Sequence, residues 1–192
     1  MQVSLPESVY RYCTDRRIRS AVDLLLSAKS PKLPDGLAWS ELPDFYRACL
    51  AAQQTRVEWA LALEESWRAV FEEAFRGWAS SSIETQAALS DICLDIGSLW
   101  TGREFYRDFQ LRTLVAQSLV QIDPDRGIRI SVALWIDDVE KPLPLRAGLL
   151  VEDGWLCSAW LPFGQTAAID LTGLQRDAAE MVAIVRQFGA AP

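Results

Sequence analysis

The sequence predicts an α+β fold, in which a helical amino-terminal half packs on a carboxy-terminal antiparallel β-meander of three to four strands closed by a final helix. Apolar and polar residues alternate with a clear period of two only over about residues 117–162. On either side of that region, apolar residues recur at steps of three and four, the spacing of helices. At 192 residues the chain fits one domain, mainly helical over 1–110, with the meander and terminal helix in 111–192.

The first expected element is a helix from Leu5 or Pro6 to about Ala28. Ser4-Leu5-Pro6-Glu7 has the form of a capping box, in which a serine and a glutamate cap the first helical turn. Thr14-Asp15 offers a cap for a second helix, so a break at that point is an alternative. The prolines and glycine between Ser27 and Gly36 then predict a loop.

A second helical region begins near Ser40 and extends over about residues 41–79. Ser40 is a good helix cap, and neither Gly nor Pro occurs from Asp44 to Arg76. Polar residues interrupt the apolar pattern over 53–56. The region is therefore either one long helix or two helices joined by a hinge.

The second part of this region, residues 56–78, concentrates large aromatic side chains on one helical face. Trp67, Phe71 and Trp78 follow steps of four and seven, and Trp59 lies about 80° away from Trp67 at 100° per residue. Such a face is typical of a buried core helix, and also of a groove or homodimer seam that binds another protein. Under the second interpretation, Trp59, Trp67, Phe71 and Trp78 form the candidate protein interface.

Between residues 80 and 122 the pattern changes from helical to extended. Ser81 and Glu84 form a second capping box, which predicts a helix over 83–96. A further short helix is expected over 101–109. Residues 111–122 alternate and precede a strong turn at 123–127, so a strand is favoured there over a helix.

The meander continues with the clearest strand of the chain, Ile128–Ile136. A hairpin follows, in which Leu145–Val151 and Trp155–Leu161 flank a turn at Glu152-Asp153-Gly154. Both faces of these last strands are apolar, which predicts that they are covered on both sides. A final helix is expected over about 174–188, capped by Asp170 or Thr172.

Charge excludes two classes of partner. The formal net charge is −7, from 26 acidic and 19 basic residues, whereas nucleic acid and anionic membranes are bound by basic surfaces. We therefore expect neither as a partner. Sixteen of the basic residues are Arg and three are Lys, a bias that indicates a GC-rich, bacterial genome.

The chain contains no histidine. This excludes Ser-His and Cys-His nucleophilic pairs, histidine general bases and His-containing zinc sites. The four cysteines form no CxxC pair, so we predict free thiols in a reducing compartment and no metal or other cofactor. The amino terminus lacks the pattern of a signal peptide, so the expected location is cytoplasmic.

Two functional hypotheses remain. The favoured one is a non-enzymatic protein-binding protein of adaptor, chaperone-like or immunity-like type, which uses the aromatic helix face or an open sheet edge and binds another protein or a second copy of itself. The alternative is a small-molecule-binding or carboxylate-based enzymatic domain, with a pocket between sheet and helices lined by Trp135, Trp155 and Trp160. Its candidate carboxylates are Asp91, Asp95, Asp137 and Glu152.

Overall fold

The structure is a computed structural model of residues 1–192. It describes residues 2–27, 36–80, 104–111, 114–136, 139–140, 142–144 and 148–189. The expected helix over 83–96 and the carboxylates Asp91, Asp95 and Asp137 lie outside these residues.

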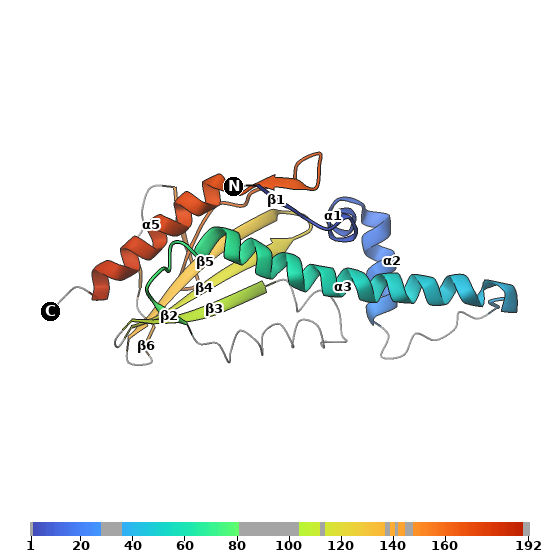
Figure 1. The fold of residues 1–192 in the computed structure, drawn as a ribbon, viewed down its shortest axis with the longest axis horizontal. Coiled ribbons are helices and arrows are strands. Elements are labelled where there is room, and N and C mark those ends of the chain that lie inside the picture. Colours follow the sequence, from blue (N-terminus) through green and yellow to red (C-terminus); the bar gives the residue numbers. More distant parts are fainter. Residues whose placement is uncertain are drawn as a thin grey trace.

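The predicted fold class is confirmed. Helices occupy the amino-terminal half, an antiparallel sheet follows, and a helix ends the described chain. The long helix α3 (Leu42–Phe71) and the terminal helix α5 (Thr172–Gly189) lie on one face of the sheet. The carboxy-terminal half of α3 crosses this face, whereas its amino-terminal half projects past the end of the sheet (Figure 1).

Two short helices accompany the projecting half of α3. They are α1 (Glu7–Thr14) and α2 (Arg16–Ser27), so the break near Thr14-Asp15 is present. The expected capping box at Ser4 is wrong, because Ser4 belongs to strand β1 (Gln2–Ser4) and Pro6 provides no side-chain cap. A 3₁₀ turn, η1 (Trp39–Glu41), leads directly into α3.

α3 is one helix rather than two. The polar residues over 53–56 contain no helix breaker, and the hydroxyl of Thr55 donates to the carbonyl of Ala51 (2.9 Å) within the helix. The helix ends at Phe71, earlier than residue 79, in a series of turns that includes Gly77 with a positive φ of 86°. At 30 residues it is about 45 Å long.

The main sheet is antiparallel, in the order β2-β3-β4-β5-β8-β7, with β6 also paired to β5. Its strands are β2 (Ala79–Ser80), β3 (Glu104–Leu111), β4 (Leu114–Asp123), β5 (Gly127–Ile136), β6 (Val139–Glu140), β7 (Leu150–Glu152) and β8 (Trp155–Cys157). Separately, β1 pairs with β9 (Ala168–Asp170).

Two sequence-based expectations around residue 110 have different outcomes. The short helix over 101–109 is wrong: residues 104–111 form strand β3, which pairs with β4 along its whole length. Phe105 and Phe109 are both buried because a period of two turns them to the same face. The strand expected over 111–122 is confirmed as β4, and Asp123 accepts hydrogen bonds from the amides of residues 125 and 126 in the turn that follows.

The last hairpin is shorter than expected. Its turn has positive φ at Asp153 and Gly154, but only three residues on each side are strand. The prediction that both faces of these strands are covered holds for Leu156 and Cys157 of β8, which are buried, and is wrong for β7, whose Leu150 and Val151 are exposed. β7 ends the strand order and has one paired side, so less of the protein packs around it.

The hydrophobic core lies between the sheet and the helices. Alternate residues of β4 and β5 point towards α3 and α5, whose buried residues complete the layer. Among the fully buried side chains are Trp59, Leu63, Trp67, Phe71, Ile122, Ile130, Leu134 and Leu156.

Candidate protein-binding surface

The structure places the aromatic residues predicted as a protein interface inside the protein. Trp59, Trp67 and Phe71 have at most 1% of their surface accessible, and Trp78 is half-buried. The prediction that they form an open binding face is therefore wrong, and the core-helix interpretation applies. The physical reason is that the sheet and α1 already cover this face of α3.

The contacts of Trp67 show that this face of α3 is fully packed against the sheet. Its ring stacks on Phe109 of β3, with centroids 5.6 Å apart, and its indole N–H donates to the hydroxyl of Ser118 on β4 (3.0 Å). The Ser118 hydroxyl in turn donates to the carbonyl of Arg107 (3.0 Å). The guanidinium of Arg107 lies 4.4 Å from the Trp67 ring centroid, and desolvation lowers the pKa of Arg107 from its usual value.

A second apolar face of the same helix is open to solvent. We call it the outer stripe: Tyr46, Leu50, Val57 and Leu61 of α3 together with Trp39 of the preceding η1. Trp39, Tyr46, Leu50, Val57 and Leu61 are 88%, 60%, 70%, 40% and 54% exposed. Together these side chains expose on the order of 500 Å², since a full aromatic side chain contributes about 150–250 Å². That is as large as the largest apolar patch on a typical monomer, and such patches are often functional.

The outer stripe is straight because of its spacing. Successive members are seven, four, seven and four residues apart, which repeats every eleven residues and so closely matches whole helical turns. At 100° per residue, its members within α3 fall in an arc of roughly 60°. Trp59 and Leu63 lie on the roughly opposite side. The seven–four spacing is present in the sequence, but the larger aromatic residues of the core face form the more prominent pattern.

Polar residues lie along the stripe and between its members. Gln53 and Gln54 occupy its middle, and Gln54 donates to Glu58 (2.7 Å), which also accepts from Ser8 of α1. Arg47 pairs with Asp44 (2.8 Å) at the amino-terminal end. The apolar line is therefore bordered by charge, the usual arrangement of a core and rim at protein interfaces.

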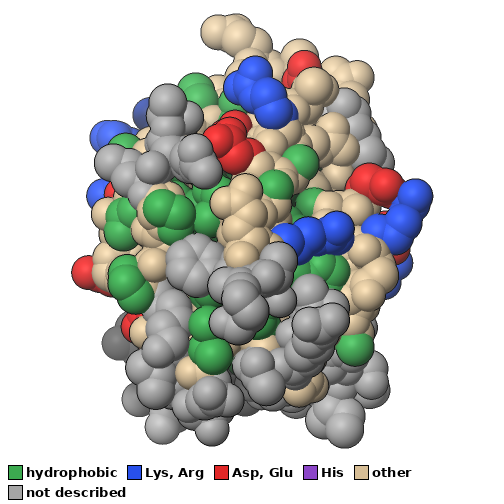
Figure 2. Space-filling model, turned by 90° about the vertical axis from the view of Figure 1, so that its left-hand side faces the viewer, with side chains coloured by type: hydrophobic (Ala, Val, Ile, Leu, Met, Phe, Trp, Pro, Cys, Tyr) green, Lys and Arg blue, Asp and Glu red, His purple; other side chains and the backbone are tan. Residues whose placement is uncertain are grey.

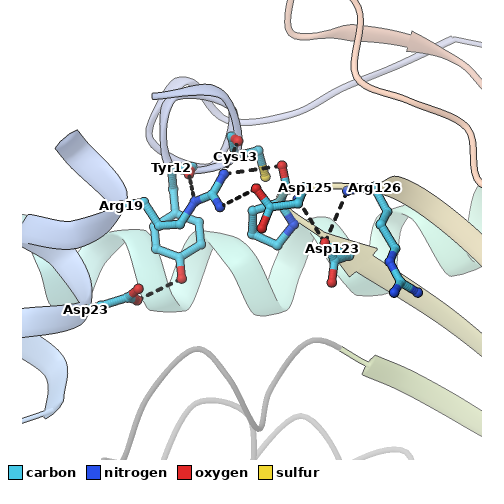
Figure 3. A network of polar contacts seen from close by, with 8 residues as sticks. Tyr12, Cys13, Arg19, Asp23, Asp123, Asp125 and Arg126 are labelled. Atoms are coloured by element: carbon cyan, nitrogen blue, oxygen red, sulfur yellow. Dashed lines mark hydrogen bonds and ion pairs between the residues drawn. The ribbon is translucent and has the colours of Figure 1, made fainter. Parts of the chain in front are cut away.

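The part of α3 around Trp59 is held in place relative to the sheet by α1 and α2. Figure 3 shows the guanidinium of Arg19 between the end of α1 and the β4–β5 turn. It donates to the carbonyls of Tyr12 (3.2 Å), Cys13 (2.6 Å) and Pro124 (3.3 Å), and to the carboxylate of Asp125 (2.8 Å). Because Tyr12 packs edge-on against Trp59, this network helps to fix the position of α3.

The three tryptophans of the alternative hypothesis do not share one pocket among the described residues. Trp135 and Trp155 meet edge to face with centroids 6.0 Å apart, whereas Trp160 is covered by the guanidinium of Arg129 at 4.6 Å. Trp155 lines a hollow of about 230 Å³, whose described lining does not include the other two. This volume is below the roughly 300–1,000 Å³ typical of small-molecule sites.

The side chains of this hollow are largely paired. Arg129 binds Glu152 (2.5 Å) and Gln121 (2.9 Å), so the one described candidate carboxylate, Glu152, is held in an ion pair. Burial raises the pKa of the Cys157 thiol, which receives a hydrogen bond from Ser131 (3.2 Å). A raised pKa keeps this cysteine protonated and so disfavours its use as a nucleophile.

A wider cleft of about 570 Å³ lies beside the end of α3, next to β1 and α5. Its wall carries acidic and basic side chains together, among them Glu65, Arg68, Glu72 and Arg76. In the residues for which the structure gives positions, no three His, Cys, Asp or Glu side chains form a group able to hold a metal ion. Cys13, Cys49 and Cys157 are free thiols, as the sequence predicts.

The end of the molecule away from the projecting half of α3 has a mixed surface rather than a continuous apolar line. Figure 2 shows the end away from the projecting half of α3, where hydrophobic side chains lie in small groups between basic and acidic ones. Within the described part of the chain, no helix has the length and apolar character needed to cross a bilayer.

No protein-family model, curated protein or solved structure matches this chain.

Proposed function

We propose that the chain is a non-enzymatic protein-binding protein, which engages an amphipathic helix of its partner along the outer stripe. The observation that supports this most strongly is the row of four large apolar side chains exposed on one line of α3, preceded by the exposed Trp39 of η1. A second helix with an apolar face is the natural complement of such a row, since helices pack by fitting side chains of one surface between those of the other.

The stripe is a better candidate than the open sheet edge. β7 has three residues, so an added strand would gain few main-chain hydrogen bonds, whereas β-augmentation draws its affinity from such bonds. The stripe instead extends from Trp39 to Leu61, and its members on α3, Tyr46 to Leu61, span about 22 Å of helix. It also ends in Trp39 and includes Tyr46, aromatic residues of the kind that dominate binding energy at interfaces.

Quantitative affinity purification from cells that naturally contain the protein tests this proposal. We expect a partner protein to co-purify with the wild type and to be lost with the double substitution Leu50→Glu and Leu61→Glu, which places charge in the apolar line. Ala48→Glu is the matched control, because it adds the same charge at an exposed position on roughly the opposite side of α3. Equal recovery of all proteins with the double variant and the control would contradict the proposal.

A further inference from the structure

The four members of the outer stripe on α3 are arranged symmetrically along the helix. Their centre is the midpoint between Gln53 and Gln54, and Leu50 and Val57 lie equally far on its two sides, as do Tyr46 and Leu61. A stripe with this symmetry is complementary to itself when a second copy runs in the opposite direction. The two-fold operation required is that of the commonest homo-oligomers.

We propose that the occupant of the outer stripe is a second copy of this chain, with the two α3 helices packed antiparallel about a two-fold axis at Gln53 and Gln54. This inference rests on the proposed function, because it names the partner of the same surface. In this arrangement Leu50 of one copy faces Val57 of the other, and Tyr46 faces Leu61. Each exposed apolar residue of α3's stripe thereby meets an apolar residue.

Charges beside the stripe fit the same pairing. A perpendicular two-fold axis brings like flanks of the two helices together, so Arg47 of one copy lies within about half a turn of Glu58 of the other. These side chains have opposite charge and lie on the same flank of α3. Glu65 is likewise brought beside the amino terminus of the opposite α3, where the helix dipole stabilises a carboxylate.

The ends of the stripe are complementary as well. Trp39 lies as far from the centre in one direction as Arg68 lies in the other. The antiparallel arrangement therefore places the exposed Arg68 guanidinium of one copy near the exposed Trp39 ring of the other. An arginine over an indole ring is a favourable cation–π contact.

The exposed area of the stripe is suited to a dimer with a small interface, and the polar residues at its centre are suited to a dimer with one defined register. Stable complexes bury about 800 Å² on each partner, and the roughly 500 Å² of exposed apolar surface, with its polar borders, approaches that size. Gln53 and Gln54 stand at the axis between the apolar pairs. A polar residue at such a position selects register, because any other alignment would leave its amide against apolar side chains.

Light scattering during size-exclusion chromatography measures the first consequence. The wild-type chain has a mass of 21.5 kDa, and we expect the measured mass to be twice this value at micromolar concentrations. Leu50→Glu should raise the dimer dissociation constant about tenfold or more, since it buries an unpaired charge. Ala48→Glu, at an exposed position on roughly the opposite side of α3, should leave it within about twofold. Circular dichroism would verify that each variant is folded.

Disulfide cross-linking tests the direction of the helices. Leu50→Cys and Val57→Cys chains, each also carrying Cys49→Ala, are purified separately, mixed and mildly oxidised, and the products are identified by peptide mass spectrometry. Antiparallel packing predicts that the disulfide between position 50 of one chain and position 57 of the other is the main product. A predominance of disulfides between identical positions would overturn the proposed orientation.

The outcomes separate this inference from the proposed function. A monomeric wild type whose partner protein is lost with Leu50→Glu and Leu61→Glu would overturn the homodimer and leave protein binding supported. A dimer that persists unchanged in this double variant would place the self-association elsewhere and also overturn the inference. A monomer with no stripe-dependent partner would contradict both.

Discussion

Leu61 and Leu63 lie two residues apart on α3 and face opposite surroundings: Leu63 is fully buried, whereas Leu61 is 54% exposed. One helix therefore carries two apolar faces. The inner face is covered by the sheet and α1, and the outer face is the surface that we propose to bind protein.

These two leucines should respond differently to the same substitution. Leu63→Ala should lower the free energy of unfolding by about 2–5 kcal/mol, because it leaves a cavity in the core. Leu61→Ala should change it by less than about 0.5 kcal/mol in dilute solution, while weakening partner binding. Urea denaturation at low protein concentration, with dimer or complex formation measured in parallel, checks both effects. Equal losses of stability would show that the outer face is also covered within one chain.

The buried hydrogen bonds of Ser118 give a second prediction. Ser118→Ala removes the acceptor for the Trp67 indole N–H and the donor to the Arg107 carbonyl, so it should cost about 1–3 kcal/mol of unfolding free energy. Ser20→Ala, at an exposed position of α2, is the control and should change stability by less than about 0.5 kcal/mol. A neutral effect of Ser118→Ala would mean that this buried link between α3 and β4 contributes little.

Arg19 should be sensitive even to a conservative change. Its guanidinium reaches three carbonyls and one carboxylate at once, which the point charge of a lysine cannot do. We expect Arg19→Ala to lower unfolding free energy by about 1–3 kcal/mol, and Arg19→Lys to recover less than half of the loss. Chemical denaturation measures this, with the exposed Arg17→Ala as control. Full recovery of the unfolding free energy by lysine would show that Arg19 contributes only its positive charge.

Asp170 predicts a pH dependence. The hydroxyl of Thr172, and then its backbone N–H, donate to the Asp170 carboxylate and lower its pKa. Because the folded pKa lies below the unfolded value of about 3.9, this stabilisation is present above that value and lost as pH falls through the folded pKa. In thermal unfolding, the stability difference between wild type and Asp170→Ala should therefore stay constant from about pH 7 to about pH 5 and shrink as pH falls below the unfolded pKa of about 3.9. A stability difference that stays constant as pH falls below this value would contradict a contribution from the ionised Asp170 carboxylate.

Local patterns predicted most of the architecture. The alternation in Ile128–Ile136 and the turn at 123–127 correctly indicated β4 and β5, since a period of two and turn chemistry are properties of neighbouring residues. The break at Thr14-Asp15 was found for the same reason. β3 was missed because Phe105 and Phe109 are four residues apart, a spacing that a helix and a strand can both place on one face.

Long-range contacts could not be predicted in this way. Arg19 and Asp125 are 106 residues apart, and only the folded topology brings them together. The burial of Trp59 and Trp67 likewise depends on which surface of α3 the sheet covers. The spacing of the apolar residues in α3 does not indicate which surface that is. The spacing of the outer stripe is present in the sequence. Its exposure follows only from the structure, in which the sheet and α1 cover the inner face of α3.

Site-specific photo-cross-linking tests most directly whether the outer stripe binds protein. The photoreactive residue p-benzoylphenylalanine replaces Leu50 in one variant and Ala48, on roughly the opposite side of α3, in a second. Each variant is expressed in cells that naturally contain the protein, and adducts are identified by mass spectrometry. We expect a protein adduct at position 50 that is absent at 48 and is lost when Leu61→Glu is added. Equal adducts at the two positions, or none at position 50, would contradict the assignment of this surface.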